Sequence, residues 1–440
     1  MPDYKYLIIG GGMAADSAVR GIRQVDATGN IGIISNENHP PYNRPPLSKG
    51  LWKGEAPEKV WRNTPSENVE LKLSATAKRV DVKNKRIVDD RGTTYSFDKL
   101  LLATGGSVRR LNEEMEGVIY FRTLDDYHRL RKLSERGKRF AVIGGGFIGS
   151  EIAAALAMND KEVTMIFPGG SIGDRVYPPA LSRFLNSYYE KKGVHILSND
   201  EVGKVEKENS TYTIQTKNGT ALTMDGVVAG IGIQPNVDLA QAMGLTIENG
   251  IVVNEFLQTS QPDVYAAGDV ASFYNTALAK RVRVEHEDNA NAMGEAAGKN
   301  MAGKPTAYHH LPFFYSDLFD LGYEGVGDLD SRLETVEDWK EQFKEGVVYY
   351  LNSGRVRGVL LWNTWGQVDH ARALIAEKGP FTARTVKGIL NNLLLVKHHD
   401  VGHCHLYISI KLLRCPCLPV VIEILDDPLA GFLLKSGIGT

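Results

Sequence analysis

The chain has 440 residues, a length that exceeds one compact core and indicates two or three domains. Hydrophobic residues make up 42% and charged residues 24%, as in ordinary globular proteins. The net charge of -2 gives no support to a nucleic-acid or acidic-membrane partner. The sequence has no run of about 18 apolar residues and no signal-peptide pattern, so no membrane span is expected. Only three cysteines occur, which favours a reducing, cytoplasmic compartment.

The N-terminal part has the pattern of a parallel doubly wound sheet. Residues 5–10 form an apolar strand that runs into glycines, and residues 14–25 place apolar side chains at helical intervals. A second strand follows at 31–35, which completes a βαβ unit. The proline-rich segment 39–52 is expected to be irregular until its end, and 95–106 is a buried strand closed by a glycine turn.

The same order restarts at residue 138, with a strand, glycines, a helix and a further strand at 161–168. Residues 263–270 are expected to form a strand with a terminal carboxylate, followed by an Ala/Gly-rich helix at about 287–302. Beyond Pro305 an aromatic-rich composition predicts an antiparallel sheet with a helix at 371–378 packed on it. The expected fold class is α/β, with two Rossmann-like, doubly wound, three-layer dinucleotide-binding domains and a C-terminal α+β domain.

Two glycine loops carry the most informative motif. They have the spacings Gly10, Gly12, Ala15 and Gly144, Gly146, Gly149. The first glycine permits a tight turn, the second lets the backbone approach a pyrophosphate, and the third small residue lets helix and strand pack closely. The helix N-terminus then offers free N–H groups and its positive dipole end to the phosphates. Because each loop follows a strand and opens a helix, we expect two dinucleotides rather than two structural turns.

A carboxylate after the second strand of such a unit binds the adenosine ribose. Glu37 is the candidate in the first unit, with a solvated loop charge as the alternative. In the second unit Gly169 stands at this place, without an arginine cluster. The choice between NADH and NADPH therefore stays open at this point, with NADH slightly preferred.

With an ATG turn at 103–105 and the pair Gly268–Asp269, the chain resembles the two-dinucleotide flavoprotein reductases, which bind FAD on the first loop and NAD(P)H on the second. The segments PYNRPPLSKGLW, GGGFIGSE, DVYAAGDV, RVEHEDNA and LPFFYSDLFDLGY are similar to one branch of the FAD-dependent pyridine nucleotide oxidoreductases. That branch contains monodehydroascorbate reductase, apoptosis-inducing factor and the oxygenase-type ferredoxin reductases. The resemblance covers about residues 5–380.

The resemblance also implies a domain plan. It gives an FAD-binding domain at 1–112 and 244–308, an NAD(P)H-binding domain at 113–243, a C-terminal interface domain at 309–390 that shields the flavin, and an atypical tail at 391–440. The tail contains HCH, CPC and the pair His398–His399, whose spacing does not suit one tetrahedral site, so no metal is expected.

The resemblance implies a set of cofactor contacts. They are Gly10, Gly12, Ala14, Ala15, Glu37, Arg44, Lys49, Ala103, Thr104, Gly105, Gly144, Gly146, Phe147, Ile148, Gly149, Glu151, Gly232, Gly268, Asp269, Glu285, His286 and Tyr315. Lys49 and Glu151 look like the catalytic ion pair beside the flavin, where hydride arrives. From the residues alone, an exposed surface lysine and a first-turn helix charge are the alternatives.

Further roles come from the same resemblance. Phe147 is similar to an aromatic residue that stacks on the flavin, with plain packing as the alternative. Arg283 and Tyr315 match positions that monodehydroascorbate reductase uses for its organic radical. An arginine suits an anionic acceptor, although Arg283 also lies close to Lys280 and Arg281 in a basic stretch.

The positions of the cysteines narrow the chemistry. Cys404, Cys415 and Cys417 all lie in the tail, and Ser48 occupies the PPLSK motif, so disulfide-reductase and cysteine-peroxidase activities are not expected. The leading hypothesis is an FAD-dependent NAD(P)H oxidoreductase that serves a one-electron acceptor, either a small radical or an iron–sulfur protein. The alternative is a slowly turning-over protein, similar to apoptosis-inducing factor, that acts through redox-controlled partner binding. A monomer or homodimer is expected.

Overall fold

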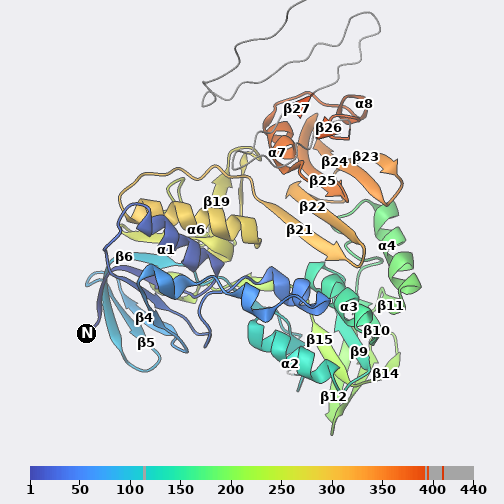
Figure 1. Ribbon diagram of the computed structural model, residues 1–440, viewed down its shortest axis with the longest axis horizontal. Coiled ribbons are helices and arrows are strands. Elements are labelled where there is room, and N and C mark those ends of the chain that lie inside the picture. Colours follow the sequence, from blue (N-terminus) through green and yellow to red (C-terminus); the bar gives the residue numbers. More distant parts are fainter. Residues whose placement is uncertain (112–114, 392–393, 396–408, 411–440) are drawn as a thin grey trace, which may run out of the picture.

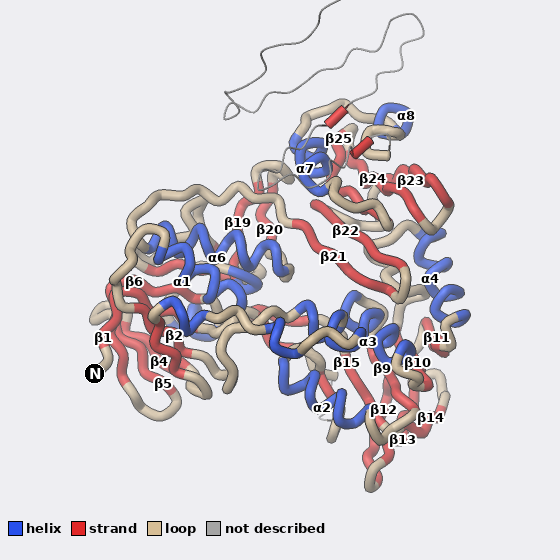
Figure 2. Tube along the Cα trace, viewed as in Figure 1, coloured by secondary structure: helices blue, strands red, loops and turns tan. Residues whose placement is uncertain are grey.

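The computed structural model describes residues 1–111, 115–391, 394–395 and 409–410. The chain forms three lobes, each built on its own sheet: an N-terminal one in blue, a second in green and a C-terminal one in orange (Figure 1). Helices lie against the sheets in all three lobes (Figure 2). The predicted fold class is confirmed, since two lobes contain parallel sheets and the third is antiparallel.

The first sheet has the order β3-β2-β1-β6-β5-β4, and β18 pairs with β6. Its strands are β1 (Asp3–Ile9), β2 (Ile31–Ile34), β3 (Val69–Lys72), β4 (Ala77–Asp81), β5 (Arg86–Asp89), β6 (Thr94–Leu102) and β18 (Val264–Ala266). The β4 and β5 strands are antiparallel additions, and the rest are parallel. All four residues of β2 are buried, because helices and other segments cover both faces of a parallel sheet.

Helices α1 (Met13–Arg23) and α6 (Glu287–Met301) pack closely against each other over this sheet (Figure 1). A Cβ atom at Gly294 would lie 2.3 Å from the carbonyl oxygen of Ala14, and one at Gly298 would lie 2.1 Å from that of Ala18. The Ala/Gly-rich composition of α6 therefore allows the backbones of α1 and α6 to approach each other closely. This contact places Ala290 of α6 beside the first glycine loop, where both line one cavity.

The second sheet, with order β11-β10-β9-β15-β8, is entirely parallel. Its strands are β8 (Ile119–Tyr120), β9 (Arg139–Ile143), β10 (Glu162–Phe167), β11 (Val194–Ser198) and β15 (Gly226–Ala229). The helices of this lobe are α2 (Leu124–Ser134), α3 (Phe147–Met158) and α4 (Pro179–Lys191), and an antiparallel sheet is formed by β12 (Val202–Glu208), β13 (Thr211–Thr216) and β14 (Ala221–Met224). Residues 149–156 of helix α3 are all buried, which agrees with the predominantly apolar sequence of this stretch.

The second sheet is inserted within the first. After β6 the chain passes through β7 (Gly106–Val108), builds the second sheet, and returns through β16 (Ile233–Pro235), which pairs antiparallel with β7. Helix α5 (Asp238–Ala242), a small sheet of β17 (Ile251–Val252), β19 (Ala271–Asn275) and β20 (Lys280–Val282), and β18 complete the first lobe. The exact domain boundaries given above stay a prediction.

The C-terminal lobe is an antiparallel sheet of order β21-β22-β25-β24-β23. Its strands are β21 (Phe313–Leu318), β22 (Leu321–Gly327), β23 (Glu334–Glu341), β24 (Glu345–Asn352) and β25 (Arg355–Trp362). Helix α7 (Val368–Ala376) packs on one face, and the other face turns toward the second lobe, where Tyr323 and Trp362 join the core that contains α3. The chain continues through α8 (Ala383–Val386), β26 (Leu394–Leu395) and β27 (Ser409–Ile410).

The proline-rich segment 39–52 has no helix or strand before Pro45, as expected, and forms short helices toward its end. It contains the 3-10 helices η1 (Pro45–Ser48) and η2 (Gly50–Lys53), with a proline at the first position of η1, where its fixed φ and missing N–H are tolerated. Two further 3-10 helices, η3 (Pro57–Val60) and η4 (Thr64–Glu67), follow. The His and Cys residues of the predicted tail lie outside the described residues.

Candidate functional site

A cavity of about 700 Å³ lies at the carboxyl ends of four parallel strands of the first sheet. Each of these strands is followed by residues that line it: Gly10–Ala14 after β1, Asn36 and Glu37 after β2, Ala103–Gly105 after β6, and Ala267–Asp269 after β18. Ligands of open α/β sheets bind at this edge. The structure thus gathers the predicted residues of the first unit around one cavity, except Ala15, which does not line it.

The first glycine loop fits a dinucleotide phosphate. Gly10 has φ +114°, and a Cβ atom there would lie 2.1 Å from the carbonyl oxygen of Ala103, so the turn requires glycine. At Gly12 no heavy atom lies within 4 Å of the corresponding position, so this residue leaves room over the cavity. Helix α1 starts at the next residue and directs its N-terminus to the same space.

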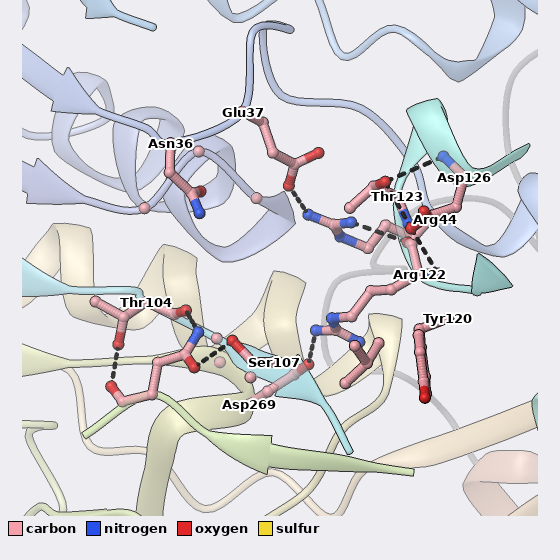
Figure 3. Close-up of a pocket in the computed structure, with 18 of the residues that line it drawn as sticks. Asn36, Glu37, Arg44, Thr104, Ser107, Tyr120, Arg122, Thr123, Asp126 and Asp269 are labelled. Atoms are coloured by element: carbon pink, nitrogen blue, oxygen red, sulfur yellow. Dashed lines mark hydrogen bonds and ion pairs between the residues drawn. The ribbon is translucent and has the colours of Figure 1, made fainter. Parts of the chain in front are cut away.

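Charged side chains link into a polar wall along this cavity (Figure 3). Glu37 forms an ion pair with Arg44 and accepts a hydrogen bond from the Tyr42 hydroxyl at 2.5 Å. Arg44 also donates to the carbonyl oxygen of Arg122 at 3.1 Å, and Arg122 in turn pairs with Asp269 at 2.8 Å. Glu37 and Asp269, both predicted to contact cofactor, therefore already have arginine partners.

The second glycine loop repeats the backbone geometry of the first. Gly144 has φ +117°, and a Cβ atom there would lie 2.4 Å from the carbonyl oxygen of Gly230, whereas the space at Gly146 is open. Helix α3 begins at the next residue, and Gly149 lies against the backbone of Gly144. Gly232 lies in the turn after β15, where its carbonyl oxygen accepts from the backbone N–H of Arg109 at 2.9 Å.

Glu151 lies where the three lobes meet. Its carboxylate, in α3, is 3% exposed and pairs at 2.7 Å with Lys49, which is 11% exposed. The hydroxyl of Ser48 donates to it at 2.6 Å, and that of Ser316 in β21 donates at 2.5 Å. Lys49 is therefore a largely buried cation and not a surface lysine. Ser48 and Ser316 complete the set of donors around the carboxylate.

Aromatic rings gather beside this ion pair. The His286 ring stacks on Phe314 with centroids 4.4 Å apart and planes at 16°, and Phe147 lies 5.1 Å from Phe314 and 6.3 Å from His286. Burial of the imidazole lowers the pKa of His286 to about 4, so the ring is neutral near pH 7. The Lys49 ammonium lies 5.2 Å from the ring centroid of Tyr315, which is 38% exposed.

Burial raises the pKa of the Tyr315 phenol above its usual range, which keeps it protonated, and its hydroxyl donates to Glu287 at 3.4 Å. Arg283, by contrast, faces inward. Its side chain is 9% exposed, pairs with Glu285 at 2.7 Å and donates to the carbonyl oxygen of Asp269 at 3.0 Å. The predicted substrate residues Arg283 and Tyr315 thus differ in exposure, and their roles stay predictions.

Residues 4–294 match the protein family described as pyridine nucleotide-disulphide oxidoreductase. The chain belongs to this family. It is an NAD(P)H-dependent flavin oxidoreductase, and the cofactors of the family are FAD and NAD(P)H. Residues 297–340 and 337–377 match the C-terminal domain described for mitochondrion-associated apoptosis-inducing factor.

Relatives of this oxidoreductase confirm the branch that the motifs indicated. The chain is 35% identical to apoptosis-inducing factor 1, mitochondrial, of Dictyostelium discoideum, over 91% of this chain and 82% of that protein. It is 34% identical to monodehydroascorbate reductase 4, peroxisomal, of Arabidopsis thaliana, over 81% and 79%. The covalent putidaredoxin reductase–putidaredoxin complex has a similar fold, with a TM-score of 0.79 and 29% identity over 86% of this chain and 94% of that one.

Sequence reasoning missed several contact residues of the oxidoreductase: Tyr42, Ser48 as a donor to Glu151, Arg122, Phe314 and Ser316. Arg122 and Asp269 are 147 residues apart, and Ser316 and Glu151 are 165 apart, so no local pattern joins them. The segment FFYSDL belongs to one of the motifs that carry the resemblance, and the alternation of side chains along this strand, β21, is a local signal that places Phe314 and Ser316 on the same face. Within the described part of the chain, every helix is too short or too polar to cross a membrane.

Proposed function

We propose that this oxidoreductase takes hydride from NAD(P)H onto FAD and passes the electrons to a one-electron acceptor, without a redox-active cysteine. The observation that carries the proposal is the Lys49–Glu151 pair at the junction of the three lobes. When bound, FAD supplies a ring that accepts a hydride and releases electrons singly or in pairs. The cavity at the first glycine loop holds the FAD, and the second loop holds the nucleotide.

The chain's own residues fix charge and orientation at this junction. Glu151 accepts from Lys49, Ser48 and Ser316, which holds the lysine ammonium in one position in a site that is largely closed to water. A fixed cation in such a site stabilises developing negative charge more strongly than it does in water. Phe147, next to the glycines, covers the place where a nicotinamide ring enters.

The absence of a redox cysteine is supported by position 48. A serine stands there, and its hydroxyl is committed to Glu151. All three cysteines of the sequence lie at 404 or beyond, outside the described residues. The low cysteine count also motivates the proposal of a reducing, cytoplasmic compartment.

For the acceptor, the surface charges favour a small organic radical over an iron–sulfur protein. A protein partner needs a basic docking face. Four arginines that could form such a face have intramolecular partners: Arg281 with Glu248, Arg283 with Glu285, Arg355 with the carbonyl oxygen of Ala277, and Arg357 with Asp328. The half-exposed Tyr315 beside Lys49 offers a site for a small anionic acceptor instead.

An acceptor panel tests this assignment. The reduced protein is offered the monodehydroascorbate radical and a [2Fe–2S] ferredoxin at low and high salt. We expect fast, weakly salt-dependent reduction of the radical. A rate that is faster with ferredoxin and falls steeply with salt supports a protein partner instead.

The similarity to apoptosis-inducing factor motivates a second candidate, a slowly turning-over protein whose partner contacts change on reduction. Mass measurement by light scattering before and after NADH addition distinguishes the two. A change from monomer to dimer with slow turnover favours the second candidate, whereas fast turnover at constant mass favours the first.

A further inference from the structure

The second dinucleotide unit lacks a side chain at the position that reads the ribose. In such units, a carboxylate at the end of the second strand binds the adenosine ribose hydroxyls of NADH. Here β10 ends at Phe167 and is followed by Pro168, Gly169 and Gly170. Gly169 therefore has no side chain that could bind the ribose hydroxyls.

The carboxylate of Asp174 occupies the space that a side chain at residue 169 would fill. A Cβ atom at Gly169 would lie 2.2 Å from Oδ2, 2.9 Å from Cγ and 3.2 Å from Oδ1 of Asp174. In a glutamate, two carbon–carbon bonds of roughly 1.5 Å each separate Cβ from the carboxyl carbon. The carboxyl carbon of Asp174 is thus about as far from the Cβ position of residue 169 as the carboxyl carbon of a glutamate there would be, although Oδ2 of Asp174 is turned toward residue 169.

Backbone contacts hold Asp174 in this place. The Gly170 N–H donates to Asp174 Oδ2 at 3.2 Å, and the Gly173 N–H donates to the carbonyl oxygen of Gly145 at 2.9 Å. The second bond ties the loop directly to the second glycine loop. From the C-terminal lobe, the Ser331 hydroxyl donates to the carbonyl oxygen of Asp174 at 2.6 Å. The turn that contains Asp174 is thereby held by the second glycine loop on one side and by the C-terminal lobe on the other.

The Asp174 carboxylate is also available to a ligand. Its side chain is exposed, and no lysine, arginine or histidine of the described residues forms an ion pair with it. The next residue, Arg175, is exposed too and has no carboxylate partner within the described ranges. The two side chains define opposite preferences, because a carboxylate accepts from ribose hydroxyls while an arginine binds a 2′-phosphate.

We infer that Asp174 replaces the missing carboxylate of residue 169, so that the site selects NADH over NADPH. Asp174 accepts hydrogen bonds from the ribose hydroxyls of NADH and repels the 2′-phosphate of NADPH. The Asp174 carboxylate, and not Arg175, determines the nucleotide preference, because the carboxylate lies directly at the end of β10 and is hydrogen-bonded to Gly170. The inference rests on the proposed function, since it names the nucleotide for the second loop.

Titration calorimetry of the oxidised, FAD-loaded full chain with NAD⁺ and with NADP⁺ tests this inference. We expect NAD⁺ to bind more tightly than NADP⁺. Asp174→Asn removes the charge and leaves the size unchanged, and it should lower the preference for NAD⁺ by about tenfold or more, the range of a hydrogen bond to a charged group. Asp160→Asn is the matched control, because Asp160 is an exposed carboxylate at the far end of α3.

Two outcomes overturn the inference. One is an Asp174→Asn protein whose ratio of NAD⁺ to NADP⁺ affinity equals that of the wild type. The other is a wild-type preference for NADP⁺ that Arg175→Ala abolishes, which would assign selection to the arginine. Failure of the proposed function looks different, because NADH and NADPH, added in place of NAD⁺ and NADP⁺, then leave the flavin oxidised in every variant, whatever their affinities.

Discussion

Glu151 is the residue on which the proposed chemistry depends most. Its carboxylate is nearly inaccessible to solvent and accepts from one ammonium and two hydroxyl groups. Glutamine has nearly the same shape as glutamate but no charge. Its amide NH₂ would face groups that donate to the carboxylate in the wild type, namely the Lys49 ammonium and the hydroxyls of Ser48 and Ser316. The other members of the cluster then lose part of their hydrogen bonding in a site where an unpaired polar group costs about 1–3 kcal/mol.

We therefore predict that Glu151→Gln slows flavin reduction by NADH about tenfold or more, measured by anaerobic stopped-flow absorbance. Ser316→Ala removes one hydrogen bond to the carboxylate but leaves its charge and the pair with Lys49 in place, so it should slow the reaction less than Glu151→Gln does. Equal rates for wild type and Glu151→Gln would contradict a role of this carboxylate in the hydride step.

His286 gives a prediction on pH. Burial lowers its pKa from 6.5 to about 4. Between these two values the unfolded chain binds a proton that the folded chain does not, so the free energy of unfolding falls as the pH drops from about 6.5 to 4. For one fully uncompensated proton the slope is about 1.4 kcal/mol per pH unit.

Urea unfolding of wild type and His286→Asn over this range measures the effect. The variant should lose less stability on acidification, because asparagine does not titrate, while the remaining groups titrate alike in both proteins. If the free energy of unfolding changes equally in the two proteins from pH 7 to pH 4, the imidazole is not desolvated.

At the scale of elements, the two strand–glycine–helix units give a paired prediction. Gly10→Ala and Gly144→Ala place a Cβ atom against a carbonyl oxygen at positive φ, so both should lower the melting temperature by several degrees. Gly12→Ala and Gly146→Ala meet no protein atom within 4 Å and should leave the fold intact.

The other two variants, Gly12→Ala and Gly146→Ala, should impair cofactor binding and not stability. Gly12→Ala is expected to weaken FAD retention, and Gly146→Ala to weaken nucleotide binding, because each methyl group enters the space left for phosphate. Calorimetric scanning and the ratio of flavin to protein absorbance measure the two effects separately. Full cofactor binding by both variants would place the phosphates elsewhere.

Elements with a strong local pattern were predictable from the sequence. The helix expected at about 287–302 is α6, Glu287–Met301, and the strand expected at 161–168 is β10, Glu162–Phe167. Helix α7 starts three residues before the predicted 371, although Val368, Asp369 and His370 are weak helix formers that a local pattern does not assign to a helix. Packing of Val368 on the sheet, which a local pattern does not contain, stabilises this first turn.

At the scale of the whole molecule, the cavity joins two lobes. Its walls include the first glycine loop and also Arg122, Thr123 and Asp126, which lie at the start of α2. The same long-range pairing explains why the sequence did not predict Arg122 as the partner of Asp269. The polar wall exists only once the inserted sheet is in place.

FAD is therefore expected to stabilise both lobes. A ligand at one hundred times its dissociation constant adds about 2.7 kcal/mol to the free energy of unfolding. Stripping FAD should lower the melting temperature, and adding it back should restore the value in a concentration-dependent way. A melting temperature that does not respond to FAD would contradict the assignment of this cavity.

The central claim is that the first loop holds FAD, the second holds the nucleotide, and the Lys49–Glu151 junction serves hydride transfer between them. An anaerobic titration of the purified protein with NADH tests this claim most directly. The account predicts a yellow protein whose flavin absorbance is bleached by about one equivalent of NADH and returns when a one-electron acceptor is added. A protein that takes up no FAD, or a bound flavin that NADH leaves oxidised, would contradict it.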